Sequence, residues 1–506
     1  MKVKQIKLKN FRNYTEQIIK IASGTNVFVG QNAQGKTNIL EAIYLCTCAR
    51  SHRTGKDNDL IRDGADFYQV EIQFESDKSV FENKSINEED SELVGKTMNT
   101  EKSLIDTQLL ISYKSNKNNI NQNIIQTFCE NKSLVEEIRI KYKKFPSIER
   151  NIYYCGFKQE KISDLIGLFH AVIFAPEDVM LIKEGPAGRR RFLDLLISQI
   201  KPLYFRNLQL YQQYLKQRNN LLKILREMQI DKRMKSPAYD PEIYNFNLLQ
   251  LTIWTEHLAK ISAQIISTRY RYILQIEKFA IEALEKISEG KEKLKINYKT
   301  VSGIDPKLDT NQIYESLMYR FERQKEDDIQ RGSTGSGSHR DDLELFVDGN
   351  LLKERGSQGQ QRSAVLALKL AELQIIENET NQKPVLLLDD VMSELDDKRR
   401  THLLSAFEDN QVFITCTDLG QIYPEYKGEF LDKEELFKKR EYADNLNKQD
   451  SNVSENNSED LSDKRKSSNT DIIENKQDNN FENNLNHSYI NFFKVHEGTV
   501  KRQYLL

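Results

Sequence analysis

The chain has 506 residues, 38% hydrophobic and 30% charged, which is enough apolar material for two or more globular units. Its net charge of −2 excludes a polycation, so any surface that binds nucleic acid has to be a local patch of basic residues. The sequence has no apolar run long enough for a membrane helix, no signal-peptide core and no Cys-x-x-Cys pair. We therefore expect a cytoplasmic protein with neither a membrane domain nor a zinc site.

The first 30 residues predict β-strands that lead into a glycine-rich loop. Charged and apolar residues alternate up to Leu8, and the short apolar run 27–29 ends at Gly30. Residues 37–45, rich in Leu and Ile, predict the helix that follows. A strand, a glycine loop and a helix in this order form the arrangement that a phosphate-binding loop requires.

The next stretch predicts two short strands separated by a polar insertion. The strands lie near 67–74 and 151–157, and we interpret them as a pair. The residues between them, about 77–148, are rich in Asn, Lys, Ser and Glu, which predicts a largely disordered surface loop. Within that loop, residues 134–142 could form one or two turns of helix.

The middle of the chain predicts long helices, from about 189 to 229 and from about 244 to 289. An amphipathic stripe with a spacing of three to four residues marks the second of them: Leu258, Ile261, Ile265, Tyr272, Ile276, Phe279 and Ala283. The stripe fits either the core of a helical lobe or a short coiled-coil arm. We favour the lobe, because the pattern is too short for an extended arm.

Strand and helix patterns resume after Gly349. The runs 383–388 and 411–415 predict buried strands, and residues 490–500 predict another strand near the end of the chain. Residues from about 424 to 487 are polar and rich in Asn, Asp and Glu, which predicts a second disordered insertion.

The first motif that carries chemistry is a full phosphate-binding loop of the form G-x-x-x-x-G-K-T. Its members, in order, are Gly30, Gln31, Asn32, Ala33, Gln34, Gly35, Lys36 and Thr37. Glycines let backbone N–H groups approach phosphate oxygens, and the start of the following helix adds positive potential. We expect Lys36 to reach the β- and γ-phosphates of ATP and the Thr37 hydroxyl to bind Mg²⁺. The alternative is an ordinary glycine-rich turn, which the flanking strand and helix disfavour.

The second motif is the apolar run 385–388 followed by two acids, Asp389 and Asp390. A buried strand that ends in carboxylates can place Asp389 on Mg²⁺ or on its water. Asp390 then lies next to the attacking water and is the candidate general base. Strands often end in Asp, so this motif gains its weight from the loop at residues 30–37.

The third motif consists of Ser357, Gly359 and Gln360. It stands directly before the apolar helix 363–376, where a hydroxyl and free N–H groups can bind phosphate or simply cap the helix. One ATP does not need two such helix starts from one subunit. We therefore expect this motif to serve the γ-phosphate that Lys36 of a second copy holds.

Basic residues cluster at Arg189, Arg190 and Arg191, and again between Lys216 and Lys235. Each cluster is either a solvated helix face or part of a track for DNA phosphates. Few aromatic residues lie among them, which argues against stacking on bases. Arg53, beside His52, could contact DNA or only structure the loop behind the first helix, and His339 and Arg340 leave the same choice open.

The motifs stand in the order found in ABC-type ATPases: loop, signature, acidic strand and a Ser-x-x-Asp segment, here Ser393 to Asp396. Together with further segments they make the chain resemble the RecF family. The segments that carry the resemblance are Leu8–Tyr14, Arg50–Thr54, Phe174–Asp178, Gly185–Asp194, Gln217–Asn219, Gly337–Asp342 and Ser357–Glu372. They are spread over most of the chain outside the two polar insertions.

The resemblance implies an α/β fold, an ABC/SMC-type P-loop ATPase head with an inserted helical second lobe. It divides the chain into an N-terminal part of the ATPase lobe at 1–180, a helical lobe at 181–320 and a C-terminal part of the ATPase lobe at 321–506. It also implies that Arg12 and Asn13 contact the adenine end of ATP.

The same resemblance implies an ATP-dependent, DNA-binding protein of replication and recombinational repair that dimerises when ATP binds. Such a dimer would bind DNA at single-strand gaps or junctions and help RecR and RecO to load RecA, in support of the SOS response. ATP hydrolysis would be slow and act as a timer, and the protein would be cytoplasmic and associated with the nucleoid.

Some features depart from related patterns. Ser338 stands where the family pattern has proline, residues 412–418 lack the switch histidine of transporter ATPases, and both insertions look longer than the family needs. A chromosome-structure protein of the SMC type would need hundreds of residues of heptads between its motifs. A nuclease fused to the same head would need a further acidic domain after Asp389. The sequence has neither, so both alternatives are disfavoured.

Overall fold

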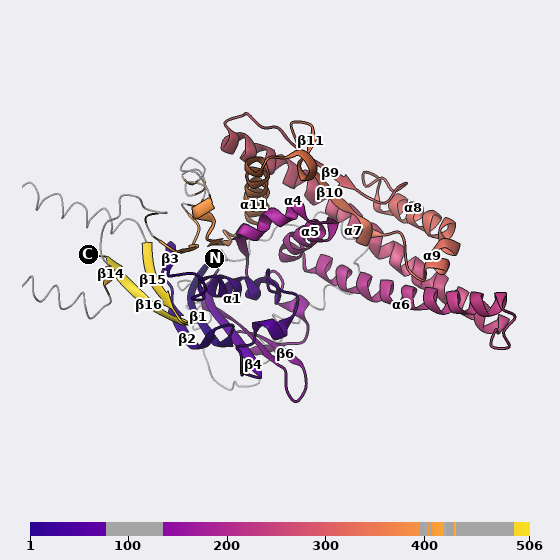
Figure 1. Cartoon of the computed structure of the whole chain (residues 1–506), viewed down its shortest axis with the longest axis horizontal. Coiled ribbons are helices and arrows are strands. Elements are labelled where there is room, and N and C mark those ends of the chain that lie inside the picture. Colours follow the sequence, from indigo (N-terminus) through magenta and orange to yellow (C-terminus); the bar gives the residue numbers. More distant parts are fainter. Residues whose placement is uncertain are drawn as a thin grey trace, which may run out of the picture. The chain divides into compact units, whose positions relative to one another are not determined.

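The computed structural model describes residues 1–76, 135–394, 409–418 and 490–505, together with positions 400, 403, 407, 420 and 430–431. The chain divides into two compact units, Met1–Phe74 with Glu137–Leu506 and Glu75–Glu136. The fold described below is that of the first unit (Figure 1). Residues 77–134 and nearly all of 424–487 lie outside the described residues, so the disorder predicted for them stays a prediction.

A six-stranded sheet is formed by the N-terminal third of the chain, in the strand order β2-β1-β4-β5-β6-β7. Its strands are β1 (Lys2–Phe11), β2 (Tyr14–Lys20), β4 (Phe67–Glu75), β5 (Val135–Lys143), β6 (Glu149–Tyr154) and β7 (Phe157–Gln159). The alternation predicted for the N-terminus is confirmed, since Val3, Ile6 and Leu8 are buried while Lys2 and Lys9 face outward.

Strand β5 overturns three predictions for this region. Residues 135–148 are not a disordered loop, because β5 pairs antiparallel with β6 and places Ile140 opposite Ile152. The strand also takes the place of the helical turns predicted at 134–142, and it separates the two strands that were predicted to pair. Its buried residues recur with a period of two among charged ones, which suits a half-buried strand and not a helix.

The second sheet has seven strands, in the order β14-β16-β15-β3-β13-β12-β8. Its strands are β3 (Thr25–Val29), β8 (Ala171–Phe174), β12 (Val385–Asp389), β13 (Val412–Cys416), β14 (Phe430–Leu431), β15 (Ile490–His496) and β16 (Thr499–Leu505). Neighbours from β15 to β8 are parallel, so their carboxyl ends meet at one edge of the sheet. The strands predicted at 383–388 and 411–415 are confirmed, whereas residues 490–500, predicted as one strand, form β15 and the start of β16 with a turn between them.

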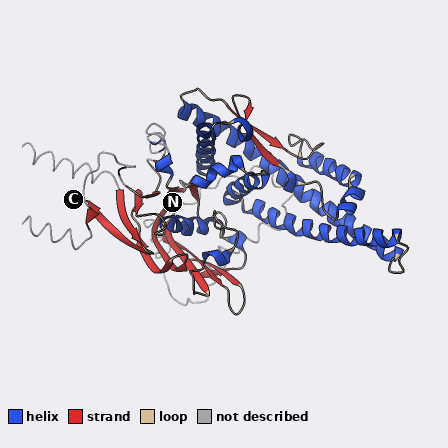
Figure 2. Ribbon diagram, in the orientation of Figure 1, coloured by secondary structure: helices blue, strands red, loops and turns tan. Residues whose placement is uncertain are grey.

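Helices, blue in Figure 2, make up most of the chain between β8 and β12. These helices are α4 (Met180–Lys183), α5 (Pro186–Ile200), α6 (Pro202–Arg233), α7 (Pro241–Ser288), α8 (Thr310–Arg323), α9 (Lys325–Arg331), α10 (Leu352–Arg355) and α11 (Gln358–Thr380), while α1 (Lys36–Cys48) directly follows the loop after β3. Proline opens α5, α6 and α7, where its missing N–H costs no helical bond. Short 3₁₀ turns lie at 57–60, 162–164, 176–179, 338–340 and 391–394.

A third, three-stranded sheet lies next to the helices and consists of β9 (Leu294–Lys299), β10 (Asp342–Val347) and β11 (Asn350–Leu351). Because β9 and β10 pair along their full length, residues on both sides of position 320 belong to one piece of structure. Helix α8 also runs across that position. The domain boundary predicted between residues 320 and 321 therefore falls inside a helix.

Two hydrophobic cores lie on opposite faces of the parallel strands. In β12, Val385 and Leu387 point into the core shared with the first sheet and α1. Leu386 and Leu388 point into the core shared with α5, α7 and α11. A parallel strand covered on both faces reads as a continuous apolar run, which is why this segment was recognisable in the sequence.

The apolar stripe of α7 belongs to the second of these cores. Leu258, Ile265, Tyr272 and Ile276 are buried in it, and the other predicted members pack against its edge. The interpretation as the core of a helical lobe is therefore confirmed. Within the described part of the chain, no helix combines the length and the apolar character needed to cross a membrane.

Candidate functional site

The predicted phosphate-binding loop connects the end of β3 to the start of α1. Gly35 caps the helix with a φ of 110°, in the left-handed region that favours glycine. A side chain at Gly30 would approach the carbonyl oxygen of Val495 to within 2.3 Å, so only glycine fits there. Both glycines of the motif are thus required by the backbone.

The loop is held from two sides. Asn13 Nδ2 donates to the carbonyl oxygen of Gln34 at 2.9 Å, and the Tyr14 hydroxyl donates to that of Gly35 at 3.0 Å. From the other side, the N–H of Glu497 donates to Gln34 Oε1 at 2.5 Å and the N–H of Gly498 donates to the Gln34 carbonyl oxygen at 3.3 Å. Sequence analysis missed this β15–β16 turn, although a Glu-Gly pair between two strand patterns is a turn signal.

Lys36 folds back over the loop. Its Nζ donates to the carbonyl oxygens of Gly30 at 2.6 Å and Gln31 at 2.8 Å. Burial lowers the pKa of Lys36, and the nearby carboxylates of Asp390 and Asp389 oppose that shift. The ammonium group therefore lies between the loop and the two acids that end β12.

Asp389 and Thr37 are brought together at the carboxyl edge of the parallel strands. The Thr37 hydroxyl donates to Asp389 Oδ1 at 2.8 Å, and the Thr415 hydroxyl donates to the same oxygen at 2.7 Å. Burial raises the pKa of Asp389, while these two hydrogen bonds act in the opposite direction. One hydroxyl and one carboxylate oxygen at this spacing are the hard oxygen ligands that suit Mg²⁺.

Asp390 adopts a φ of 51°, which turns it out of the strand. Its N–H donates to Thr415 Oγ1 at 3.0 Å, and its carbonyl oxygen accepts a bond from the Ser393 hydroxyl at 2.7 Å. Its carboxylate oxygen Oδ1 is buried and has no hydrogen-bond partner among the described residues. The backbone is fixed and the carboxylate is left available. Asp396, the other predicted residue of this segment, lies outside the described residues.

Arg12 is bound by a carboxylate that sequence analysis did not single out. Its Nε and one terminal nitrogen donate to the two oxygens of Glu41 at 2.8 and 2.7 Å, and its other terminal nitrogen donates to the carbonyl oxygen of Asp59 at 2.8 Å. Burial alone would raise the pKa of Glu41, but hydrogen bonds from Arg12 and Ser51 bring it below its ordinary value. The guanidinium plane is thereby fixed near Asn13 and the loop.

The signature residues begin helix α11. Ser357 Oγ accepts from the N–H of Gln360 at 3.1 Å, and Gln360 Oε1 accepts from the N–H of Ser357 at 3.0 Å. The capping interpretation of this motif is therefore confirmed. Ser357 is also exposed, so the cap leaves its outer side open to solvent. Its predicted role toward a second copy stays a prediction.

The three consecutive arginines at the start of α5 have different surroundings. Arg189 is buried and makes a bidentate pair with Asp342, at 2.7 and 3.0 Å. Arg190 is half-buried and donates to the carbonyl oxygen of Asp341 at 2.6 Å. Arg191 is exposed and donates to the carbonyl oxygen of Ser51 at 2.8 Å. The structure argues against the predicted DNA contact of Arg189, because its charge is buried and paired with Asp342.

Arg53, the remaining arginine predicted to contact DNA, is 38% exposed. One of its terminal nitrogens donates to Asn38 Oδ1 at 3.2 Å and lies 3.8 Å from Glu41. Arg53 belongs to the loop behind α1, and Arg191 of α5 contacts the same loop at Ser51. The two arginines therefore present two accessible guanidinium groups beside this loop. Arg190 is less accessible than either.

Arg218 shows the same contrast in the helical lobe. It is 1% exposed, pairs with Asp328 at 2.8 Å and donates to Thr334 Oγ1 at 2.7 Å. Its guanidinium also lies 4.8 Å from the centre of the Phe321 ring. Neither alternative for the cluster that starts at Lys216, a solvated helix face or a track for DNA phosphates, fits Arg218, because its side chain is buried and ties α6 to α9.

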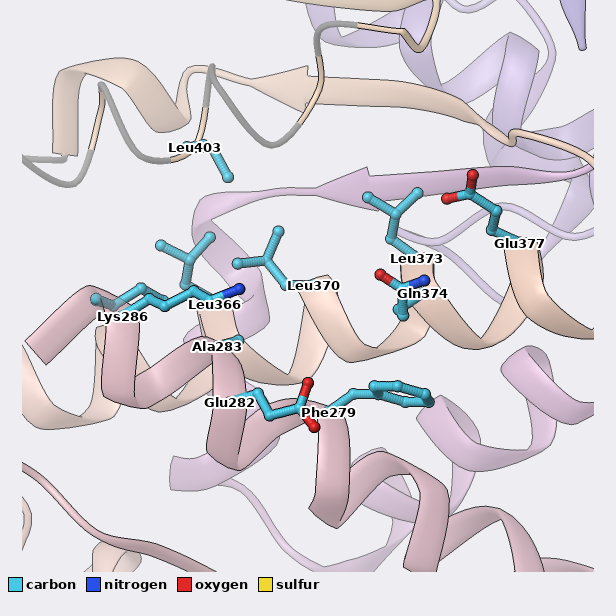
Figure 3. Close-up of a pocket in the computed structure, with 11 residues that line it drawn as sticks. Phe279, Glu282, Ala283, Lys286, Leu366, Leu370, Leu373, Gln374, Glu377 and Leu403 are labelled. Atoms are coloured by element: carbon cyan, nitrogen blue, oxygen red, sulfur yellow. The ribbon is translucent and has the colours of Figure 1, made fainter. Parts of the chain in front are cut away.

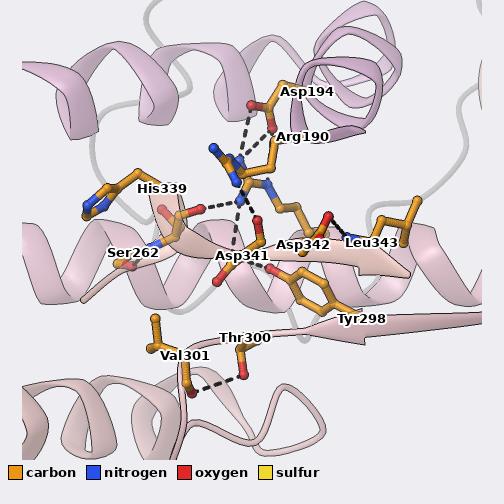
Figure 4. Close-up of polar contacts among 12 residues, drawn as sticks. Arg190, Asp194, Ser262, Tyr298, Thr300, Val301, His339, Asp341, Asp342 and Leu343 are labelled. Atoms are coloured by element: carbon orange, nitrogen blue, oxygen red, sulfur yellow. Dashed lines mark hydrogen bonds and ion pairs between the residues drawn. The ribbon is translucent and has the colours of Figure 1, made fainter. Parts of the chain in front are cut away.

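A buried polar network joins α5, α7, β9 and the segment that precedes β10 (Figure 4). Arg269 is paired with Asp194 at 2.9 Å and with Asp341 at 3.1 Å, and the Tyr298 hydroxyl donates to Asp341 at 2.6 Å. Burial raises the pKa of Asp341 to about 6, although Arg269 opposes the shift. The segment 337–342 is thus part of the packing between helices and sheet.

Ser338 and His339 complete this junction. The N–H of Ser338 donates to Ser262 Oγ at 2.9 Å, a bond that proline at this position could not make. His339 Nδ1 shares a 2.5 Å hydrogen bond with the Tyr211 hydroxyl, and burial lowers the pKa of the ring to about 4. His339 is therefore neutral near pH 7 and is not a cationic contact for DNA, and Arg340 is the exposed member of this segment.

A cavity of about 170 Å³ lies between α7 and α11 (Figure 3). Phe279 and Ala283 line it from α7, Leu366 and Leu370 line it from α11, and Leu403 closes it on a third side. Ligand pockets usually measure several hundred Å³. The cavity is too small for a nucleotide, and none of the Gly30–Thr37 loop lines it.

Comparisons with known proteins agree with this geometry. The family model for the RecF/RecN/SMC N-terminal domain matches residues 2–423. The chain is 36% identical over 447 residues to the DNA replication and repair protein RecF of Acetivibrio thermocellus, which covers 88% of this chain and 97% of that protein. It is 34% identical over 424 residues to the RecF of Bacillus subtilis, covering 83% and 95%.

Solved structures give the same result. A structure of the recombination mediator protein RecF with ATP, in the RecFOR pathway, matches with a TM-score of 0.67 and 28% identity, covering 99% of this chain and 98% of that one. A second structure of the same protein, with ATPrS, matches with a TM-score of 0.66 at the same identity and covers 99% and 97%.

Proposed function

Because this chain belongs to the RecF family, with an ABC/SMC-type ATPase head, we propose that it is an ATP-dependent DNA-binding protein of replication and recombinational repair. The observation that supports this most is the convergence of Lys36, Thr37, Asp389 and Asp390 at one edge of the parallel strands. The solved RecF structure with ATP supports the same choice of nucleotide.

Each residue of this edge has a distinct part in binding ATP. The N–H groups that open α1 donate to phosphate oxygens, and Lys36 exchanges the Gly30 and Gln31 carbonyl oxygens for the β- and γ-phosphates. Thr37 and Asp389 would hold Mg²⁺, which would neutralise phosphate charge when bound. Arg12, whose plane Glu41 fixes, and Asn13, which holds the loop at Gln34, are the residues proposed to contact the adenine end of ATP.

Asp390 orients and deprotonates the attacking water through its buried, unpartnered Oδ1. Its side chain is one methylene shorter than the Glu common in ABC ATPases, so we expect slow turnover. Hydrolysis then acts as a timer for a DNA-bound state rather than as the main product-forming activity.

The second half of each ATP site comes from another copy. Ser357, Gly359 and Gln360 begin a helix whose exposed start can bind the γ-phosphate held by the partner copy. Ser393 and Asp396 follow the catalytic strand and belong to the same interface. The protein is therefore a dimer only while ATP is bound.

DNA binding rests on the exposed arginines behind α1, Arg53 and Arg191, with a smaller share from Arg190. Arg189 is withdrawn from the proposal. We propose that the dimer binds at single-strand gaps or junctions in the nucleoid and helps RecR and RecO to load RecA, which supports the SOS response.

Sedimentation velocity tests the proposal, with the protein alone, with ATP and Mg²⁺, and with both plus a gapped duplex. We expect a monomer alone, a dimer with ATP, and a dimer on DNA with both. Lys36→Ala is the matched control and should stay monomeric in every mixture. A wild-type protein that ignores ATP, or that binds no gapped DNA when dimeric, would contradict the proposal.

A further inference from the structure

The turn between β5 and β6 exposes two large apolar side chains. Phe145 is 66% exposed and Ile148 is 71% exposed, three residues apart on the same short turn. The turn closes the hairpin beyond the labels of β4 and β6, at the lower edge of the view in Figure 1. Surface apolar residues usually occur singly, so a pair at one tip calls for an explanation.

The backbone of this hairpin is held as far as Lys144, whereas the side chains at its tip are exposed. The Tyr142 hydroxyl donates to Asn58 Oδ1 at 2.9 Å, and the N–H of Lys144 donates to the carbonyl oxygen of Asp66 at 2.8 Å. Arg150 pairs with Asp57 and donates to the carbonyl oxygen of Ala49 at 3.3 Å. These bonds attach the hairpin to residues 49–66, so its tip is presented in a defined position.

The tip carries unpaired positive charge. Lys141, Lys143 and Lys144 are exposed, and none of them forms an ion pair with another described residue. The tip has one acid, Glu149, which accepts a hydrogen bond from the Ser147 hydroxyl at 2.9 Å. At the base of the hairpin, by contrast, Arg139 is neutralised by Glu71. These three cations outnumber the two exposed acids beside them, Glu149 and Asp66, which favours a polyanionic partner.

The hairpin is also attached to the loop behind α1, residues 49–66, which carries four basic and four acidic residues. That loop, which anchors the hairpin through Ala49 and Asp57, exposes Arg50, Arg53 and Lys56. Arg191 reaches the same loop at Ser51. The tip therefore extends the surface already proposed to bind DNA.

We propose that the tip of the β5–β6 hairpin, formed by Lys143, Lys144, Phe145 and Ile148, binds DNA where a duplex gives way to a single strand. The lysines contact phosphates, and the Phe145 ring stacks on an unpaired base, with Ile148 beside it as a second apolar contact. An aromatic ring needs a free base face, which a gap offers and an intact duplex does not. This inference rests on the proposed function and names the part of the DNA that the surface selects.

A protein partner fits these residues less well. Lysine is depleted in the buried core of protein interfaces, whereas here two lysines directly precede the exposed ring. A basic groove with interleaved aromatic residues is instead the usual composition of a single-strand binding surface.

The test is fluorescence anisotropy in the presence of ATP, with a labelled gapped duplex and an ungapped duplex of the same sequence. Phe145→Ser should weaken gapped-DNA binding by about 5- to 100-fold and leave duplex binding unchanged. Lys143→Gln with Lys144→Gln should weaken binding to both and lower the salt dependence by about two counterions. Phe157→Ser and the pair Lys293→Gln with Lys295→Gln remove equally exposed residues away from the tip and should match wild type.

The outcomes separate this inference from the proposed function. If wild type binds gapped DNA and the tip variants bind it equally well, the hairpin has no part in DNA binding and the inference fails alone. If the tip variants bind DNA normally but lose a protein partner, the tip is a protein-docking element, which also overturns it. If wild type binds no DNA under any condition, the proposed function fails together with it.

Discussion

The carboxyl edge of the parallel strands and the junction around Arg218 and Arg269 are both dense in charge, but they use it differently. At the strand edge, Asp390 keeps a buried carboxylate oxygen without a partner among the described residues, and Lys36 is bonded only to backbone carbonyl oxygens. At the junction, both arginines are almost fully buried and each is paired with at least one aspartate. A candidate functional site therefore differs from a structural ion pair in having polar groups that can still form hydrogen bonds, and not in the amount of charge.

The same contrast occurs within one turn of helix. Arg189 and Arg191 stand two residues apart in the same basic run, yet the first is buried against Asp342 and the second is exposed beside Ser51. Helix geometry turns residues two apart onto different faces, so they meet different neighbours. A basic cluster therefore has to be divided residue by residue before any part of it is assigned to DNA.

The largest expected effect is on catalysis at the strand edge. Asp390→Asn keeps the shape and hydrogen-bonding capacity of the side chain but removes the base, so ATP hydrolysis should fall by about 10²- to 10⁴-fold. ATP binding should persist, and the dimer should live far longer than that of wild type. Asp418→Asn, an exposed acid at the end of the neighbouring strand, is the matched control and should leave the rate unchanged.

Asp389→Asn should act differently and weaken Mg²⁺-dependent nucleotide binding, because Asp389 shares its oxygen with Thr37. The measurement is ATP hydrolysis and dimer lifetime, side by side for all three variants. Equal hydrolysis by wild type and Asp390→Asn would remove Asp390 as the base.

The next effect is on stability at the junction. Arg218→Ala leaves Asp328 buried and unpaired, so the free energy of unfolding should fall by about 3–5 kcal/mol. Arg226→Ala, on the exposed side of the same helix, should change it by less than about 0.5 kcal/mol. Urea unfolding at pH 7 measures both. A small loss for Arg218→Ala would mean that its charge is not structural.

A third effect concerns acid stability. Burial lowers the pKa of His52 to about 4, and neither ring nitrogen has a partner among the described residues. A histidine with a folded pKa below its unfolded value of about 6.5 stabilises the fold above that pH, and the contribution is lost as pH falls toward 4. Between pH 7 and pH 4 the free energy of unfolding of the wild type should fall by up to about 3 kcal/mol through His52, and His52→Leu should abolish that part of the decrease.

Urea unfolding at several pH values measures the His52 effect. His257→Gln, at an exposed histidine on α7, is the control and should follow wild type. If His52→Leu follows wild type as well, burial of His52 does not set its protonation.

The smallest effect is on DNA affinity. Arg191→Gln should weaken binding by about two- to tenfold for every DNA sequence and reduce the salt dependence by about one counterion. Arg189→Gln should instead lower stability and leave the salt dependence as it is, since its charge is paired with Asp342. DNA affinity measured over a range of salt concentrations distinguishes the two variants. If both variants show the same affinity and salt dependence, the assignment of Arg191 to DNA and of Arg189 to the fold is wrong.

The parts of the fold that sequence predicted correctly are those with local signals. The glycine loop, the apolar run of β12 and the stripe of α7 can each be recognised from a local pattern of residues in the sequence. Strand β5 was missed because its polar composition masked an alternation of period two. The pairing of Arg189 with Asp342 was missed because the two residues lie 153 positions apart, and no local pattern links them.

The account depends most on ATP being bound between Lys36 of one copy and Ser357 of another. Lys36→Ala should abolish ATP binding at the loop of the copy that carries it. Ser357→Arg should block the ATP site on the loop of the partner copy. Neither variant should therefore dimerise alone with ATP and Mg²⁺. An equimolar mixture retains one complete site, built from Lys36 of the second variant and Ser357 of the first. Sedimentation of that mixture should show a dimer. A mixture that stays monomeric, or a Ser357→Arg protein that dimerises alone, would contradict the shared site.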